Sequence, residues 1–139
     1  MQTFKEYITE LFNQPAEFEL VEVDEGLIYQ YKSYIEEDAL VVSMAYYEGQ
    51  WEVVFWVNDK LNITNSDGNE FVVFSTVIAI LKDFVRRENP EFIKFSARKD
   101  ERSRVSLYGK MIDKLAKENG YRIRKSDNIL HIDYELQRK

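Results

Sequence analysis

The sequence predicts an α/β (α+β) domain in which a mixed, mostly antiparallel sheet is flanked by helices. Three observations favour this class. Apolar residues recur at helical spacing in some segments, alternate with polar residues in others, and turn-forming residues separate the two kinds. The chain has 139 residues, of which 45% are hydrophobic, with 5 Gly and 2 Pro. This composition indicates one compact domain over residues 1–139.

The first helix is expected over residues 3–13. Thr3-Phe4-Lys5-Glu6 has the form of a capping box, in which the hydroxyl and the carboxylate satisfy backbone N–H groups at a helix start. Apolar residues follow at the spacing of one helix face, and Pro15 ends the pattern.

Residues 18–58 alternate between apolar and polar side chains and are rich in β-branched and aromatic residues, which is typical of strands. Three or four antiparallel strands are expected here, and the strongest are Leu40–Tyr47 and Trp51–Val57. Turn signals divide the region at Asp24-Glu25-Gly26, Glu36-Glu37-Asp38 and the hairpin turn Glu48-Gly49.

The segment Asn58–Asn69 is dense in turn-forming residues and is the longest loop candidate. After it, apolar residues from Val72 onward keep a helical period until Asn89-Pro90 ends the helix. A short strand is expected over Phe92–Ser96, followed by an amphipathic helix over Ser103–Asn119.

The chain ends in two predicted strands, Tyr121–Arg124 and Ile129–Leu136. Between them, Ser126-Asp127-Asn128 forms a cluster of turn residues. The predicted order is therefore α-β-β-β-α-β-α-β-β.

The net charge of −6 hides a division between the two halves of the chain. Residues 1–70 hold 15 acidic and 3 basic residues, whereas residues 71–139 hold 10 acidic and 16 basic residues. The division predicts either an acidic face and a basic face that orient partners, or two halves that pair with each other.

This order of elements resembles the GNAT N-acetyltransferase fold, whose central sheet splays open between its fourth and fifth strands. The resemblance covers nearly the whole chain and implies acetyl-CoA as cofactor. In that family, backbone N–H groups of the loop before the central helix wrap the pyrophosphate. Here that loop is Ile63–Asn69, so the implied cofactor-binding residues are Ser66, Asp67, Gly68 and Asn69. The segment Phe74–Gly120 is also similar to small uncharacterised phage-encoded proteins.

Two motifs depart from the family's pattern. The loop holds one Gly and carries Asp67 and Glu70, whose charges repel phosphate. The family's late helix commonly ends Leu-Tyr, three residues, Gly-Phe, with the Tyr placed to protonate the departing thiolate, and here Ala116 stands at the Tyr position. Tyr108, about 12 Å upstream along the helix axis, is then the candidate catalytic residue.

Four cations, Arg98, Lys99, Arg102 and Arg104, surround the loop that follows the strand at Phe92–Ser96. Cations around a helix start suit a phosphate, a small nucleotide, a carboxylate or a protein partner. The other interpretation is a solvated loop in which two neighbouring acidic residues neutralise half of the charge.

Acidic residues alternate along residues 17–25 and cluster again at Glu36, Glu37 and Asp38. Protection of an edge strand by outward charges is one interpretation, and an acidic face that binds a basic partner is another. Metal binding is a further interpretation, because carboxylates on one face of a strand line up, but edge protection is the favoured one and no metal is expected. The chain has no Cys and a lone His, His131, which excludes thiolate and His-rich zinc sites.

Two functions follow from these observations. The first is a divergent or inactive acyl-CoA-dependent N-acetyltransferase acting on a small-molecule amine. The alternative is a non-catalytic interaction protein, of the kind by which phages bind host proteins, using the acidic face or the loop Arg98–Arg104.

Several classes of partner and location are not expected. A nucleic-acid partner is not expected, because the predicted strands that are rich in aromatic residues lack interleaved basic residues. Membrane association is not expected, because no segment is long and apolar enough to span a membrane. The first twenty residues lack the apolar core of a signal peptide, so a cytoplasmic location is expected, in the host cell for a phage protein. The oligomeric state is left open.

Overall fold

A computed structural model describes residues 15–57, 70–98, 102–127 and 129–139. The helix expected over residues 3–13 and the loop expected over residues 58–69 lie outside the described residues. The described elements follow one another as β1 (Phe18–Asp24), β2 (Ile28–Ile35), β3 (Asp38–Tyr47), β4 (Gln50–Val57), α2 (Glu70–Glu88), β5 (Phe92–Arg98), α3 (Arg102–Asn119), β6 (Tyr121–Asp127) and β7 (His131–Arg138).

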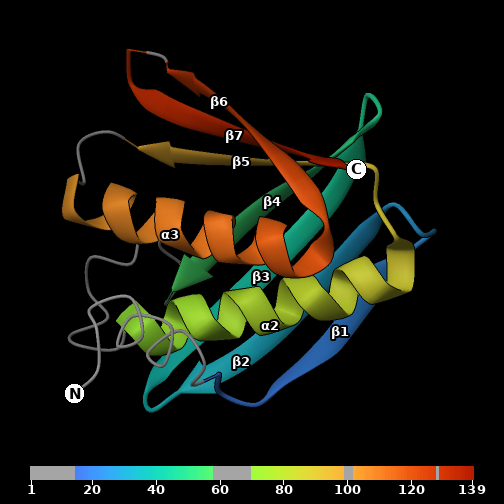
Figure 1. Ribbon diagram of the computed structural model, residues 1–139. Helices are drawn as coiled ribbons and strands as arrows, with labels where there is room; N and C mark the ends of the chain where they lie inside the picture. The colour runs from blue at the N-terminus through green and yellow to red at the C-terminus, as the bar shows by residue number, and fades with distance from the viewer. Residues whose placement is uncertain (1–14, 58–69, 99–101, 128) are drawn as a thin grey trace.

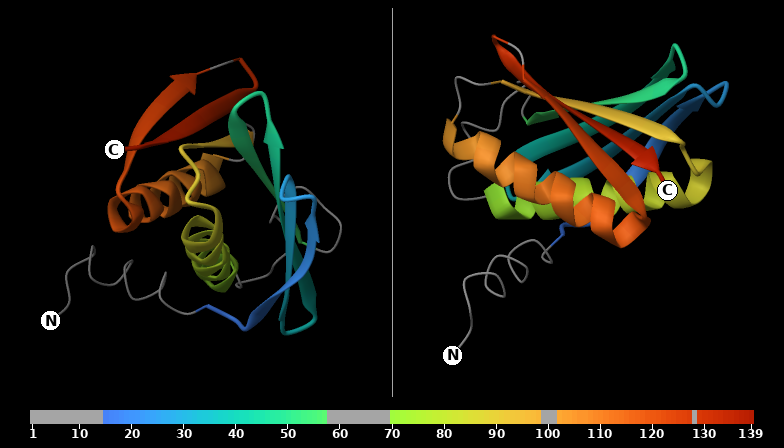
Figure 2. Two further views of the ribbon diagram at one scale, coloured as in Figure 1. Left: turned by 90° about the vertical axis from the view of Figure 1, so that its right-hand side faces the viewer. Right: turned by 45° about the horizontal axis from the view of Figure 1, so that its top comes forward.

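The seven strands form one twisted sheet in the order β1-β2-β3-β4-β5-β7-β6. Among the described strands, β4 and β5 form the one parallel pair, and every other neighbouring pair is antiparallel. Both described helices lie on the same concave face of the sheet (Figures 1 and 2). The predicted fold class, a mixed and mostly antiparallel sheet flanked by helices, is therefore confirmed.

The core lies between the concave face and α2. Strands β2, β3 and β4 bury every second residue, as strand alternation requires. Phe84 of α2 packs edge-on against Tyr29 of β2, with ring centroids 5.1 Å apart, and against Trp51 of β4, at 5.0 Å. These aromatic contacts, together with buried aliphatic side chains of α2, join the helix to the first half of the sheet.

The three predicted turns of the first half are confirmed. Glu25 and Gly26, and likewise Glu48 and Gly49, have positive φ angles at both central positions, as two-residue hairpins with the right-handed strand twist require. The turn between β2 and β3 places Glu36 in the same left-handed region, at φ 56°.

Other boundaries differ from the prediction. The expected order has three strands before the central helix, and the structure has four, because residues 18–24 pair with β2 along most of their length. Helix α2 begins at Glu70 instead of Val72. The predicted turn cluster Ser126-Asp127-Asn128 is wrong in part: Ser126 and Asp127 continue β6, opposite Asp133 and Ile132 of β7. Cross-strand pairing here overrides the local turn preference of these residues.

Candidate functional site

The sheet opens between β4 and β5, and this opening is the candidate site. The two strands pair only at Trp51 with Ile93 and at Glu52 with Lys94, within the described ladder. Beyond those pairs they diverge toward their carboxyl ends (Figure 1). Ligands of open α/β sheets commonly bind at the carboxyl ends of parallel strands that separate in this way.

The backbone of β4 presents hydrogen-bonding groups to this opening. In an antiparallel ladder, successive residues direct their N–H and C=O groups to alternate sides. Tyr46 of β3 donates to the Leu27 carbonyl at 2.8 Å, on the β2 side of the sheet. The alternate residues of β3 therefore bond to β4, opposite Glu52, Val54 and Trp56.

By the same alternation, the remaining residues of β4 turn their backbone groups toward β5. The pairs Trp51–Ile93 and Glu52–Lys94 occupy the backbone groups of Trp51 and the N–H of Val53, whereas Phe55 and Val57 have no ladder partner in the described part of β5. Unpaired strand edges bind extended chains that carry their own amides. The opening therefore offers a row of backbone donors and acceptors to an extended ligand.

Aromatic side chains close the concave side of the opening. Phe55 of β4 packs edge-on against Phe74 of α2, with ring centroids 6.4 Å apart, and Phe95 of β5 is fully buried. This apolar wall excludes water from the helix side of the two strands. Because Phe74 lies in the second turn of α2, the first part of that helix lies against the opening.

Hydrogen bonds between α2 and earlier segments fix the position of the helix. Tyr29 donates to Oε2 of Glu88 at 2.7 Å. Near the start of α2, the Thr76 hydroxyl donates to the Val72 carbonyl at 2.7 Å and accepts the backbone N–H of Ala16 at 2.9 Å. The beginning of α2 is thus tied to the segment that leads into β1.

The convex side of the opening carries a polar pair. The Ser96 hydroxyl of β5 donates a 2.7 Å hydrogen bond to Oδ1 of Asp133 on β7. Both residues lie on the face of the sheet without described helices, since they alternate with buried Phe95 and Tyr134. Sequence reasoning missed this pair, because it depends on the pairing of strands 37 residues apart.

The predicted cation cluster surrounds the carboxyl end of β5. Arg98 is the last residue of β5, Arg102 is the first residue of α3, and Arg104 follows in its first turn. The backbone therefore brings these three to the same end of the sheet as the opening. Their side chains and the whole of Lys99 lie outside what the structure describes.

The predicted cofactor residues Ser66, Asp67, Gly68 and Asn69 lie outside the described residues, in the segment that joins β4 to α2. The helix that follows begins immediately after them, at Glu70.

The predicted catalytic Tyr108 lies in α3, and His131 begins β7, but the side chains of both are outside the described part. The structure indicates another candidate tyrosine for this role, Tyr134 of β7, whose hydroxyl lies against α3. A Cβ added to Gly109 would be 3.4 Å from this hydroxyl. Burial raises the pKa of Tyr134, and the nearby carboxylates of Asp113 and Asp127 raise it further. Tyr134 therefore keeps its proton at neutral pH.

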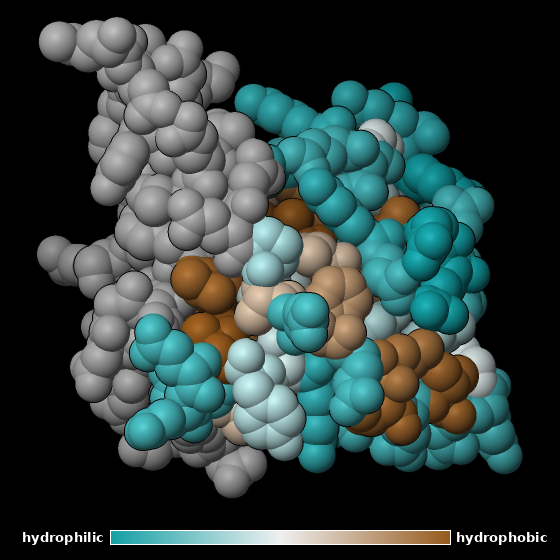
Figure 3. Space-filling model, turned by 90° about the horizontal axis from the view of Figure 1, so that it is seen from below, coloured by the Kyte–Doolittle hydropathy of each residue, from teal (hydrophilic) through white to brown (hydrophobic). Residues whose placement is uncertain are grey.

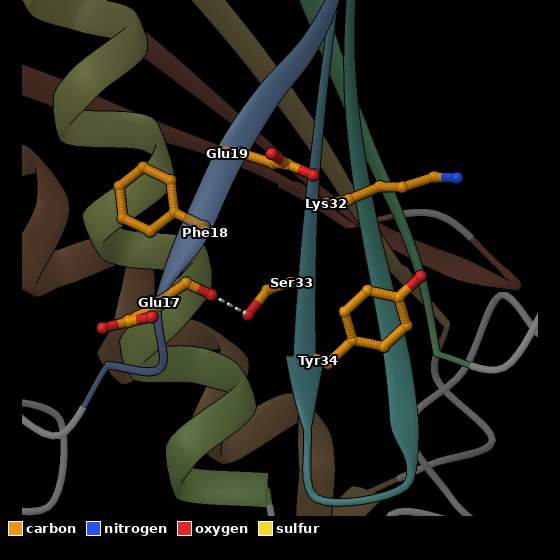
Figure 4. Close-up of a pocket in the computed structure, with 6 residues that line it drawn as sticks. All are labelled: Glu17, Phe18, Glu19, Lys32, Ser33 and Tyr34. Carbon is orange, nitrogen blue, oxygen red and sulfur yellow. Dashed lines mark hydrogen bonds between the residues drawn. The ribbon is translucent and has the colours of Figure 1, made fainter.

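The predicted acidic cluster lies at the turn between β2 and β3, where Glu36 and Glu37 are exposed. A hollow of about 300 Å³ lies nearby, between the start of β1 and the end of β2 (Figure 4). It is lined by Glu17, Phe18, Glu19, Lys32, Ser33 and Tyr34. The Ser33 hydroxyl already donates to the Glu17 carbonyl at 2.6 Å, and the side chains of Phe18 and Tyr34 point away from each other (Figure 4).

Solved structures similar to this chain are acetyltransferases. A Bacillus subtilis acetyltransferase in complex with CoA is 12% identical in sequence, with a TM-score of 0.51 over 87% of this chain and 97% of that chain. The chain has the GNAT fold. A ribosomal-protein-S5-alanine acetyltransferase from Vibrio fischeri is 9% identical, with a TM-score of 0.50 over 82% of this chain and 63% of that one, so the chain spans less than two thirds of its length.

The sequence itself matches no protein-family model and no curated protein. At 9% to 12% identity, the GNAT likeness is one of fold.

Among the described residues, no helix has the length and apolar character needed to cross a membrane. The same residues contain no group of three or more His, Asp or Glu side chains placed to hold a metal ion.

Proposed function

We propose that this protein is a divergent acyl-CoA-dependent N-acetyltransferase whose cofactor lies in the opening between β4 and β5. The observation that carries the proposal is the unpaired backbone edge of Phe55 and Val57. Support comes from a fold neighbour that was crystallised with CoA. The predicted cytoplasmic location belongs to the same proposal.

The residues of the opening fit the chemistry of acetyl-CoA. The arm of this cofactor carries amide groups in an extended chain, which can pair with a free strand edge. Its phosphates would be held by Arg98, Lys99, Arg102 and Arg104 and by a helix start. When bound, acetyl-CoA supplies the acetyl thioester, and the acceptor is a small-molecule amine.

Two tyrosines are candidates to protonate the leaving thiolate. Tyr108 is the candidate from the sequence, on α3. Tyr134 is the candidate from the tertiary structure, because its buried hydroxyl keeps its proton and lies beside α3, one strand from β5. Replacing each by Phe and measuring the turnover of acetyl-CoA with a panel of amines would separate them.

Binding is tested by calorimetry with acetyl-CoA and CoA, combined with residue-resolved amide hydrogen exchange. We expect the amides of Phe55 and Val57 to exchange more slowly in the complex. The amides of Val54 and Trp56 are internal references, since they already bond to β3. Absence of binding at millimolar ligand, or protection confined to another part of the sheet, would refute the proposal.

The phosphate contacts are tested by replacing Arg98, Arg102 and Arg104 together by Ala. We expect the affinity for CoA to fall by about tenfold or more and to depend less on salt. The matched control is Arg122→Ala on β6, which removes an exposed cation away from this loop and should leave the affinity unchanged. Equal loss in both variants would show that overall charge, not the loop, determines binding.

A non-catalytic interaction protein, such as a phage protein that binds a host protein, is the second candidate. The carboxylates of Asp67 and Glu70 beside the implied phosphate site favour it. Its test is capture from host lysate with charge reversal at Glu36, Glu37 and Asp38, compared with reversal at Arg98, Lys99, Arg102 and Arg104. Capture unaffected by either reversal would count against this candidate.

A further inference from the structure

Among the described strands, β1 and β6 form the two edges of the sheet. Within the described residues, each of these strands has one neighbour, β2 and β7 respectively. All residues of β6 after Tyr121 are exposed, and so are the last four residues of β1. The strand edges therefore present backbone donors and acceptors to solvent at both ends of the sheet.

The two edges carry opposite charges on the same face. On the convex face, β1 presents Glu19, Glu22 and Asp24, which lie opposite polar or exposed residues of β2. On the same face, β6 presents Arg122 and Arg124, opposite Gln137 and Glu135 of β7. The division of charge along the sequence thus becomes an acidic edge and a basic edge of one sheet.

These charged side chains are available to a partner. Glu19, Glu22, Arg122 and Arg124 form no ion pair or side-chain hydrogen bond with another residue in the described parts of the chain. Apolar side chains of β1 are exposed as well: Val21, at the bulge, is 42% exposed, and Val23, opposite Tyr29 on the concave face, is 48% exposed. Figure 3 looks at the molecule from below, the side on which Figure 1 shows β1, and apolar areas interrupt the hydrophilic surface there.

The direction of the strands allows the two edges to meet. Direction reverses at each antiparallel neighbour and is kept at the parallel pair β4 and β5, so β1 and β6 run antiparallel to each other. A second copy shifted sideways in the plane of the sheet, without being turned over, brings its β1 antiparallel to β6 of the first. The convex faces of the two copies then form one continuous surface. On that surface, the carboxylates of β1 in one copy lie beside Arg122 and Arg124 of the other.

We propose that copies of this protein associate edge to edge, with β6 of one copy pairing with β1 of the next. Backbone hydrogen bonds supply the attraction, and the charges select the partner edge. Two β1 edges would place carboxylates against carboxylates, and two β6 edges would place guanidinium groups together. The bulge between Leu20 and Glu22 interrupts the ladder of β1, which keeps the association weak and reversible.

Such a contact joins two different surfaces, so it does not close at a symmetric dimer. Sedimentation velocity of the full chain should show an average mass that rises with protein concentration and falls with added salt. A monomer at all concentrations in low salt, or a mass that stops at the dimer, would overturn the proposal.

Charge exchange between the edges gives the decisive test. Glu19→Lys with Glu22→Lys makes both edges basic, and Arg122→Glu with Arg124→Glu makes both edges acidic. Each double variant should be monomeric alone, and an equimolar mixture should associate again. The matched control is Lys117→Glu on the exposed side of α3, which should associate like the unmodified protein.

Thermal melting of each variant verifies that it is folded before association is compared. Hydrogen exchange in the unmodified protein should show amides of β1 and β6 becoming more protected as concentration rises. A mixture of folded variants that stays monomeric would overturn the proposal. So would a monomeric protein whose β6 amides are protected by a poly-glutamate peptide, which would assign this edge to an acidic partner instead. None of these readouts depends on binding of acetyl-CoA.

Discussion

Tyr31 of β2 donates a 2.8 Å hydrogen bond to Oδ2 of Asp83 on α2, 52 residues later in the chain. The same oxygen accepts the Nε–H of Arg87 at 2.7 Å, and Arg86 pairs with the other oxygen. Tyr31 is fully buried, whereas the two arginines lie at the surface. One carboxylate therefore joins the core of the sheet to the surface of the helix whose beginning lies against the opening.

Tyr31→Phe removes the buried donor of this network. We expect the free energy of unfolding to fall by about 1–2 kcal/mol, because a buried hydrogen bond to a charged group is lost while the ring remains. Urea denaturation measures the change. Tyr34→Phe is the matched control, since Tyr34 is 68% exposed on the same strand, and it should change stability by less than about 0.5 kcal/mol. Equal effects would show that the bond to Asp83 contributes nothing.

The stability of the protein should fall in acid through Asp83. Burial alone would raise the pKa of Asp83, but hydrogen bonds from Arg87, Tyr31 and Arg86 together lower it below its ordinary value of 3.8. A carboxyl whose pKa is lower in the folded state stabilises the fold above its unfolded pKa, and this stabilisation is lost as the pH falls through the folded value.

Asp83→Asn tests this dependence. The variant should be less stable than the unmodified protein at neutral pH, and the difference should shrink below about pH 4. Denaturant unfolding over a range of pH measures it. Glu37→Gln, at an exposed turn position, should leave the curve unchanged. A difference between Asp83→Asn and the unmodified protein that is constant with pH would contradict the assignment.

The aromatic cluster around Phe84 should contribute more than its buried area. Its ring meets both Tyr29 and Trp51 edge-on. Phe84→Leu keeps an apolar side chain but removes both ring contacts, so we expect a loss of about 1–3 kcal/mol in unfolding free energy. Thermal and urea unfolding measure it. A loss below that of Val54→Ala, at a position 39% exposed, would show that the cluster repacks without cost.

Gly109→Ala should stabilise the protein. Alanine in a helix interior is favoured over glycine by about 0.5–1 kcal/mol, and the new Cβ meets the Tyr134 hydroxyl at 3.4 Å, an ordinary contact. A higher melting temperature is the expected result. The double variant with Tyr134→Phe separates the two effects: near-additive changes fit this account, and a strong rescue by Phe would show that the glycine is needed for close approach.

Local features of this protein could be predicted from the sequence because they depend on near neighbours. The two-residue turns at Glu25 and Glu48 follow from the glycines that come second in them, Gly26 and Gly49, and α2 follows from apolar spacing ended by Asn89-Pro90. The order of these elements was sufficient to predict the fold class. Boundaries set by pairing, such as the continuation of β6 to Asp127, were predicted wrongly, since turn propensity is weaker than a cross-strand ladder.

The tertiary structure alone decided which distant residues meet. The sequence placed a charge division between its halves, but only the strand order turns it into Glu22 at one edge and Arg124 at the other. The divergence of β4 from β5, and the position of the Tyr134 hydroxyl beside Gly109 of α3, likewise depend on how the whole chain packs. Patterns in sequence report the periodicity of one element, whereas contacts between elements are fixed by the burial that all of them achieve together.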